Sequence, residues 1–251
     1  MGWNLSLILI ESSSKIIDEE KFITSLGYNK VSFIKKSSLE KCINPKANTI
    51  SIGYINNSII ICADFETSLR SIREYHSFYE KELISQYPKN EIITAICNST
   101  VNLHAYSIIN NSKKIRYKYV NPENTKVEFG SALPEEQTIY SKSKKKNNHY
   151  VWLENNEEYL ECQLLEDFTF EVLKRRLGFR IDQNDYVFTE EFHTYKIAEP
   201  VSDINKGYIV SIKNSNQRAP FHKRLLKYTL YTIIIILTLN IIIYLLNFLN
   251  K

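Results

Sequence analysis

The chain has little glycine. Only six of its 251 residues are Gly, and neither GxGxxG nor GxxxxGK followed by Ser or Thr occurs, although both phosphate-binding loops need glycines at fixed positions so that backbone amides can approach the phosphates. The four cysteines form no CxxC pair, which disfavours a zinc site or a thioredoxin-like redox motif. We therefore expect no cofactor and no metal centre. A reducing, cytoplasmic environment fits these dispersed thiols.

Most of the chain also lacks a net charge. Four of the 32 Lys and Arg residues and none of the 28 Asp and Glu residues lie in residues 222–251, so residues 1–221 carry 28 charges of each sign. The basic isoelectric point is thus a property of the C-terminal part. A nucleic-acid partner is not expected, because that kind of binding uses a net basic face to displace counterions.

A long apolar run, by contrast, is present near the C-terminus. Residues 228–249 contain no Asp, Glu, Lys or Arg, and as a helix rising about 1.5 Å per residue they cross a hydrocarbon core about 30 Å thick. Only Lys251 follows the run, whereas the residues before it include Arg218, His222, Lys223, Arg224 and Lys227. By the positive-inside rule we expect a single-pass, tail-anchored membrane protein with a cytoplasmic N-terminal domain.

This pattern predicts three parts: a cytoplasmic domain over residues 1–212, a basic polar linker over 213–227 and a transmembrane helix over 228–249. The bilayer is then the first partner. Asn240 lies within the span, where a polar side chain can pair with a second helix, so a weak homo-oligomer is one expectation. An incidental Asn in an Asn-rich sequence is the alternative.

Apolar periodicity predicts an α+β domain with a mostly antiparallel sheet and two to three packed helices. Residues 3–10 predict a buried first strand. Two hairpins are expected to turn at Asn56-Asn57 and Asn110-Asn111, because Asn tolerates the left-handed conformation of tight turns. Residues 121–149, rich in Pro, Glu, Ser and Lys, predict a mobile loop. The other predicted elements are helices over 18–26, 64–86 and 157–177 and strands near 31–34, 91–96, 186–189 and 207–212.

The best candidate for catalysis combines Cys97 with His104, near the turn between two predicted strands. With Glu166 or Asp167 on the later helix they can form an activated thiolate. The alternative is that the cysteine packs as a small core residue and the histidine is a structural hydrogen-bonding residue.

A second candidate is an anion site for a phosphate-bearing ligand, because the guanidinium fork matches phosphate geometry. Its residues are Arg116, Arg175, Arg176 and Arg180, with Lys113 and Lys114 nearby in the sequence. The alternative is a set of surface ion pairs with the acidic residues of the later helix.

Four stretches are distinctive in combination: the N-terminal MGW with the apolar strand after it, INNSIIIC, HAYSIINNSKKIR and EDFTFEVLKRRLGFRID. Together they resemble a family of small, uncharacterised bacterial cytoplasmic proteins of Bacteroidetes-type genomes. The resemblance covers residues 1–199 and leaves the apolar run as an addition. It implies a bacterial cytoplasmic domain and supplies neither an activity nor site residues.

The function that fits these patterns best is a membrane-anchored cytoplasmic interaction or sensor module without catalytic activity, with a protein partner at the inner membrane face. One alternative is a membrane-tethered hydrolase that acts on a phosphorylated or membrane-proximal substrate through His104 and the acidic helix. Another is a defence-type effector whose apolar helix oligomerises and permeabilises the membrane. The span is common to all three and does not decide between them.

Overall fold

The computed structural model describes residues 2–198 except 74, 124 and 148. The chain divides into two compact units after Pro200, and the first unit is described by itself. The predicted strand at 207–212, the linker and the span all lie outside the described residues. Within the described part, no helix is both long and apolar enough to cross a membrane.

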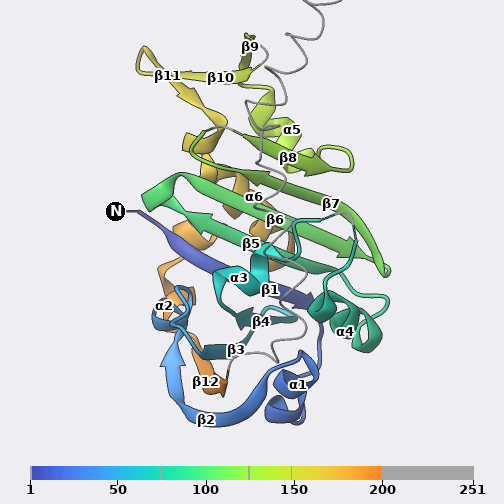
Figure 1. Ribbon diagram of the computed structural model, residues 1–251. Helices are drawn as coiled ribbons and strands as arrows, with labels where there is room; N and C mark the ends of the chain where they lie inside the picture. The colour runs from blue at the N-terminus through green and yellow to red at the C-terminus, as the bar shows by residue number, and fades with distance from the viewer. Residues whose placement is uncertain (1, 74, 124, 148, 199–251) are drawn as a thin grey trace, which may run out of the picture. The chain divides into compact units, whose positions relative to one another are not determined.

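One nine-stranded antiparallel sheet organises this unit, in the order β2-β12-β3-β4-β1-β5-β6-β7-β8 (Figure 1). The predicted α+β class with a large antiparallel sheet is therefore confirmed. The first strand lies in the middle of the sheet, and the last described strand, β12, lies between two strands from the first quarter of the chain. The strands are β1 Asn4–Glu11, β2 Asn29–Ser38, β3 Thr49–Ile55, β4 Ser58–Cys62, β5 Ile92–Asn98, β6 Leu103–Asn110, β7 Lys113–Val120, β8 Lys126–Phe129 and β12 Glu191–Ala198.

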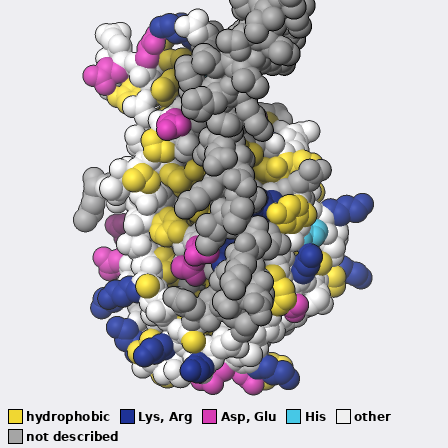
Figure 2. Space-filling model, viewed as in Figure 1, with side chains coloured by type: hydrophobic (Ala, Val, Ile, Leu, Met, Phe, Trp, Pro, Cys, Tyr) yellow, Lys and Arg dark blue, Asp and Glu magenta, His cyan; other side chains and the backbone are white. Residues whose placement is uncertain are grey.

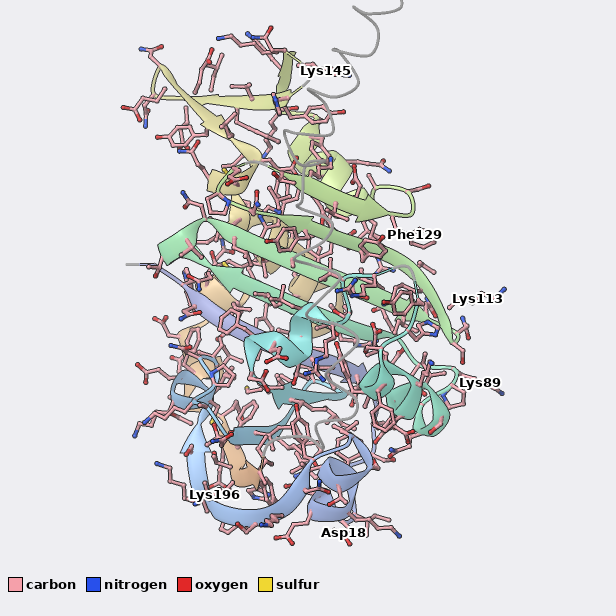
Figure 3. The ribbon with its side chains drawn as sticks, in the orientation of Figure 1. Asp18, Lys89, Lys113, Phe129, Lys145 and Lys196 are labelled. Carbon is pink, nitrogen blue, oxygen red and sulfur yellow. The ribbon has the colours of Figure 1, made fainter. Side chains whose placement is uncertain are left out.

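A second, three-stranded sheet projects from the same unit, in the order β11-β10-β9 (Figure 1). Its strands are β9 Lys144–Lys146, β10 His149–Glu154 and β11 Glu157–Leu160. In Figure 3, Lys145 on β9 and Asp18 mark opposite ends of the described unit. The described residues also form six α-helices, α1 Glu19–Ser25, α2 Leu39–Cys42, α3 Phe65–Leu69, α4 Phe78–Gln86, α5 Pro134–Tyr140 and α6 Leu165–Leu177.

The middle of the large sheet is buried on both faces, which explains why β1 is apolar at four consecutive positions, Leu7 to Ile10. Leu5, Leu7 and Leu9 belong to the core on the face covered by α2 and α6. Ile8 and Ile10 belong to the core on the other face, under α1 and α4. The two layers therefore have separate interiors, and a reactive side chain on one face is isolated from the other.

The asparagine turns form much as the sequence predicts. Asn56 and Asn57 have φ angles of 43° and 53°, so the first hairpin turns where it was expected. The second turns one residue later than predicted, at Asn111 and Ser112, with φ angles of 49° and 61°. A third pair, Asn155-Asn156, was missed and turns between β10 and β11 with φ angles of 50° and 66°.

Two predicted helices are shorter than expected. The helix over 157–177 begins only at Leu165, because the Asn155-Asn156 turn makes residues 157–160 a strand and residues 161–163 form a 3₁₀ turn, η2 (Glu161–Gln163). The helix over 64–86 is divided into α3 and α4, and Ser77 begins α4 with a reciprocal cap to Glu80. The predicted strand at 186–189 is a 3₁₀ turn instead, η4 (Asp185–Thr189).

The prediction of a mobile loop over 121–149 also differs from the structure, which has β8, α5 and β9 in this stretch. The sequence pattern was misleading for a physical reason. The stretch packs through polar side chains such as Glu136, which is fully buried, instead of through an apolar stripe. Periodicity of apolar residues cannot detect an element held in this way.

A β-bulge in β7 directs its basic side chains to both faces of the sheet. Ile109 pairs with Lys114 while Ile108 pairs with Arg116, so Ile115 is one extra residue in the strand. Lys114 consequently points toward α4, where its ammonium group lies 2.9 Å from Glu80 and donates to the carbonyls of residues 71, 73 and 75. Arg116 and Lys118 point to the α6 face.

Candidate functional site

The predicted pair Cys97 and His104 is brought together, but inside the core. The two residues are direct cross-strand neighbours on β5 and β6, and both are 0% exposed. The imidazole of His104 stacks on the ring of Phe168 from α6, with centroids 5.4 Å apart and planes at 4°. Neither ring nitrogen of His104 has a hydrogen-bond partner among the described residues. The histidine is thus packed as an aromatic ring.

The chemistry of these two groups is shifted away from catalysis. Burial raises the pKa of the Cys97 thiol to about 12, and the nearby Glu166 charge adds to the effect. Burial, with the Lys118 and Lys126 charges, holds the pKa of His104 well below its ordinary value. A neutral thiol and a neutral imidazole are therefore the resting states, and the reactive thiolate is strongly disfavoured.

The acidic partners expected on the later helix are engaged elsewhere. The Glu166 carboxylate accepts a hydrogen bond of 2.8 Å from the Ser99 hydroxyl. Asp167 forms an ion pair of 3.0 Å with Arg180. Neither carboxylate bonds His104, so the four predicted catalytic residues do not form a relay.

The four arginines of the predicted anion site lie apart, each against carboxylates. Arg175 pairs with Glu91 at 2.7 Å and Arg176 with Glu11 at 2.8 Å. Arg180 is held by three carboxylates, Asp167, Glu171 and Asp182. The arrangement matches the alternative of local ion pairs. On the face shown in Figure 2, basic and acidic side chains both occur.

Arg116 belongs instead to a buried cluster of charges beneath α5. Its guanidinium binds both oxygens of Glu136, at 2.9 and 2.7 Å, and the Tyr106 hydroxyl donates to the same carboxylate at 2.6 Å. Lys118 contacts the Glu161 carboxylate and lies 3.6 Å from Glu136. All of these side chains are at most 5% exposed.

Mutual pairing keeps this cluster ionised. Burial by itself raises the pKa of Glu136, but hydrogen bonds from Arg116 and the charge of Lys118 outweigh it, so the pKa of Glu136 is lowered. Burial lowers the pKa of Lys118, and the carboxylates of Glu161 and Glu136 oppose that shift. Removal of one member leaves an opposite charge buried without compensation, which is costly in a low-dielectric interior.

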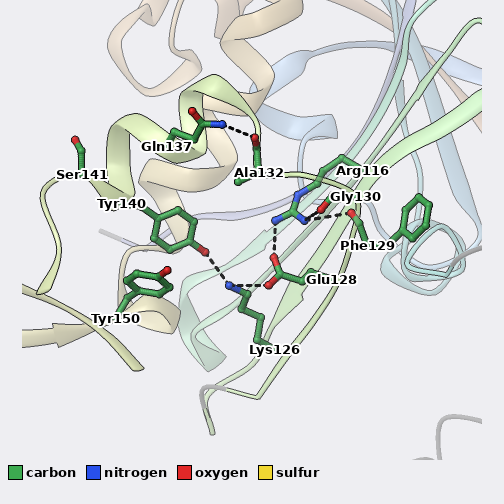
Figure 4. Close-up of a pocket in the computed structure, with 10 residues that line it drawn as sticks. All are labelled: Arg116, Lys126, Glu128, Phe129, Gly130, Ala132, Gln137, Tyr140, Ser141 and Tyr150. Atoms are coloured by element: carbon green, nitrogen blue, oxygen red, sulfur yellow. Dashed lines mark hydrogen bonds and ion pairs between the residues drawn. The ribbon is translucent and has the colours of Figure 1, made fainter. Parts of the chain in front are cut away.

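A surface pocket of about 650 Å³ opens beside this cluster (Figure 4). Lys126 lies at its wall, donates to the Tyr140 hydroxyl at 3.1 Å and pairs with Glu128 at 2.9 Å. Its ammonium also lies 5.2 and 5.7 Å from the ring centroids of Tyr140 and Tyr150. The pocket resembles an aromatic cation site whose cation is the chain's own lysine. Its remaining lining residues are Arg116, Phe129, Gly130, Ala132, Gln137 and Ser141.

A second histidine, His193 on β12, has the partner that His104 lacks. Its Nδ1 lies 3.0 Å from the Glu19 carboxylate, which also accepts hydrogen bonds from Tyr195 at 2.7 Å and Tyr54 at 2.8 Å. Because an ionised carboxylate only accepts, Nδ1 is the donor and Nε2 carries the lone pair when the ring is neutral. The His193 side chain is 37% exposed and lines a pocket of about 500 Å³.

Sequence reasoning did not find this second cluster. Its members lie on α1, β3 and β12, and Glu19 and His193 are 174 positions apart in the sequence. The pairing of β12 with β3 and the packing of α1 on that face bring them together. No local spacing encodes the contact, and only the sheet order reveals it.

The described residues contain no group of three or more His, Cys, Asp or Glu side chains placed to hold a metal ion. Comparisons of the chain with family models, with curated proteins and with solved structures find no match. The resemblance to small bacterial proteins therefore stays an expectation.

Proposed function

We propose that the chain is a membrane-anchored interaction or sensor module, with its α+β unit held at the inner face of a membrane by residues 228–249. The observation that carries the proposal is the uncharged run itself, which follows a separately folded unit and has its basic flank on the side of that unit. A span with basic residues on one side is retained with that side in the cytoplasm.

The core geometry supports a module over a hydrolase acting through His104. Cys97 and His104 are closed off by α6, and the two acidic residues bond elsewhere. The charged groups on the α5 and α6 face serve to attach α5 and η2 to the large sheet. These contacts build a scaffold, and its surface pockets are the places where a partner binds.

Membrane fractionation of the full chain tests the proposal. With a label at the N-terminus, the chain is expected to stay with the membrane after an alkaline wash, and the label is expected to resist protease in intact cells. Ile235→Lys combined with Ile236→Lys should release the chain, since each charge at a helix centre costs about 2.5–3.5 kcal/mol. A double replacement on the described unit, Val101→Lys with Tyr186→Lys, is the matched control and should leave the chain bound.

Either of two results would refute the anchor. A wild-type chain that is soluble after the wash carries no span. Cleavage of the label by protease outside the cell would show that the N-terminal unit faces outward, opposite to the proposed orientation. A release by the control variant equal to that of the span variant would show that added charge, and not the loss of the span, frees the chain.

A second candidate function, a membrane-tethered hydrolase, has specific support from His193 and not from His104. The Glu19 carboxylate fixes the tautomer of an exposed imidazole, which suits a general base. Purified full chain would be assayed with chromogenic phosphate and carboxylate esters. His193→Gln should lower any turnover at least tenfold while His104→Phe leaves it unchanged; equal turnover in wild type and His193→Gln would eliminate this site.

A further inference from the structure

A groove runs on the other side of α5 from the pocket of Figure 4. It has a volume of about 390 Å³, which is at the small end of the range of ligand pockets and suits an anchoring side chain of a peptide. Helices α5 and α6 form its walls together with β10 and β11. Its lining residues are Glu135, Thr138, Ile139, Lys142, Trp152, Leu153, Glu154, Tyr159, Leu164, Asp167, Glu171 and Arg180.

The floor of this groove is apolar and fixed in place. The Trp152 ring packs edge-on against Phe168, with centroids 6.1 Å apart, and its indole N–H donates to the Ile139 carbonyl at 3.0 Å. Leu164 and Tyr159 pack on the outer layer of the same core. Leu153 is 53% exposed beside them, so the floor offers an apolar surface that no described residue covers fully.

The rim of the groove is acidic. It holds four carboxylates against two cations, Lys142 and Arg180. Arg180 holds Asp167 and Glu171 in place at 3.0 and 3.3 Å. Glu154 is exposed and has no ion pair within the described part of the chain. A preformed apolar floor under an excess of negative charge is complementary to a ligand that is both apolar and basic.

We propose that this groove binds a basic amphipathic peptide segment of a partner protein. An apolar side chain of the segment enters beside Trp152 and Leu153, while Lys or Arg side chains pair with Glu154 and Asp167. This is the recognition mode in which an amphipathic segment places its apolar face in a groove. The inference rests on the proposed interaction function and adds the chemistry of the partner. An anionic lipid surface is disfavoured, because the rim carboxylates would repel it.

The test uses the full chain in nanodiscs of neutral lipid and a defined probe. The probe is a fluorescein-labelled 15-residue peptide with Leu at helical spacing and Lys at the other positions. A matched peptide carries Glu in place of Lys. Fluorescence anisotropy should give a Kd at least tenfold lower for the Lys peptide, after subtraction of its binding to empty nanodiscs. The emission of Trp152, measured in a Trp3→Phe background, should shift as the peptide binds.

Variants locate the binding. Leu153→Ser and Glu154→Lys change exposed groove residues and should each weaken binding of the Lys peptide at least fivefold. Val101→Ser and Glu40→Lys make the same changes at exposed positions outside the groove and should leave the Kd within twofold. Circular dichroism of each variant verifies that the unit is folded.

The inference would be overturned by equal binding of the Lys and Glu peptides, by equal effects of the groove and control variants, or by an unchanged Trp152 emission at saturation. Self-association of the chain that Leu153→Ser abolishes, without peptide binding, would assign the groove to a second copy and also overturn it. Membrane fractionation tests the anchor separately from the groove. Peptide binding by a chain that is not membrane-bound would refute the proposed anchor alone. A membrane-bound chain without affinity for the peptide would refute the proposed groove alone.

Discussion

The two histidines on opposite faces of the sheet show two different uses of the same side chain. His104 has a cysteine as its cross-strand neighbour and no hydrogen bond on either nitrogen among the described residues. His193 bonds the carboxylate of Glu19, which is distant in the sequence and also accepts hydrogen bonds from Tyr195 and Tyr54. Proximity in the sequence made His104 a candidate through its neighbour Cys97, whereas tertiary packing brings His193 to its carboxylate partner.

The two histidine environments differ in how far their charged neighbours are buried. The Arg116–Glu136 and Lys118–Glu161 pairs on the α6 face are closed to solvent, and His104 stays neutral beside the Lys118 charge. The side chains of Glu19 and His193 are 10% and 37% exposed and line a surface pocket. A buried imidazole without partners is a packing element, whereas an exposed imidazole held by a carboxylate is available for chemistry.

The largest effect should come from the buried charges on the α6 face. Glu136→Ala leaves Arg116 and Lys118 without their shared carboxylate, and breaking a buried pair in this way costs about 3–5 kcal/mol. Urea denaturation of the full chain measures the loss in free energy of unfolding. Glu135→Ala, one residue earlier in the same helix, should cost less than about 1 kcal/mol because its ion pair is weaker and partly exposed. Similar losses in the two variants would contradict the role assigned to the cluster.

On the other face, the corresponding change should be milder. Glu19→Ala removes the acceptor of three side-chain hydrogen bonds, but the cluster lines a surface pocket and two of its donors, Tyr54 and His193, are partly exposed. Water can replace the lost acceptor there, so we expect a loss of about 1–2 kcal/mol. The same denaturation assay applies, with Glu40→Ala as the exposed control. If Glu19→Ala lowered the free energy of unfolding as much as Glu136→Ala, the Glu19 and Glu136 clusters would not differ as described.

The pH dependence of the free energy of unfolding should reveal the burial of His104. The folded state holds the pKa of His104 below its ordinary value near 6.5, so below pH 6.5 the unfolded chain binds one more proton than the folded chain. Stability is then complete above about pH 6.5 and falls with pH, by up to about 1.4 kcal/mol per unit, until the folded pKa is reached. His104→Phe keeps the stacking ring and should flatten this slope at pH 5–6.5.

The control for that experiment is His149→Phe, which replaces an exposed histidine and should leave the slope unchanged. Stability of each variant would be followed by urea titration at half-unit steps of pH. An unaltered slope in His104→Phe would mean that the histidine is not held neutral by its burial.

The smallest expected change concerns the thiol beside His104. With a pKa raised to about 12, Cys97 should remain unlabelled by iodoacetamide at pH 8 in the folded chain and become labelled in urea. Mass spectrometry of the digested chain reports this. Rapid labelling of Cys97 under native conditions would reopen the thiolate hypothesis for the α6 face.

The sequence predicted the fold class because its signals are local. The apolar strand at 3–10 and the turn at Asn56-Asn57 depend on neighbours a few residues away. The segment between residues 121 and 149 was mistaken for a loop because Glu136 and its partners replace an apolar stripe. The helix expected from 157 was too long because the turn signal of Asn155-Asn156 was not used.

The candidate sites were harder to predict than the fold. Cys97 and His104 were predicted near one turn, and the pairing of β5 with β6 makes them direct neighbours, yet nothing in their spacing indicates that α6 seals them. Glu19 and His193 meet only because β12 returns to the sheet beside β3. The groove beside Trp152 likewise joins two helices and a hairpin. Such sites depend on long-range packing, which a single sequence does not display.

The position of β12 also has a consequence for the order of events during synthesis. Among the described strands, β2 pairs with β12 alone, and β12 pairs with β3, although β3 ends at Ile55 and β12 ends at Ala198. At about 5–20 residues per second, ribosomes need roughly 7–30 s to make the chain between them. During that interval β3 offers an open edge to any other strand. Of the strands that the structure describes, β12 is made last and fills the place between β2 and β3, so we expect a nascent chain stalled before residue 191 to be prone to aggregation.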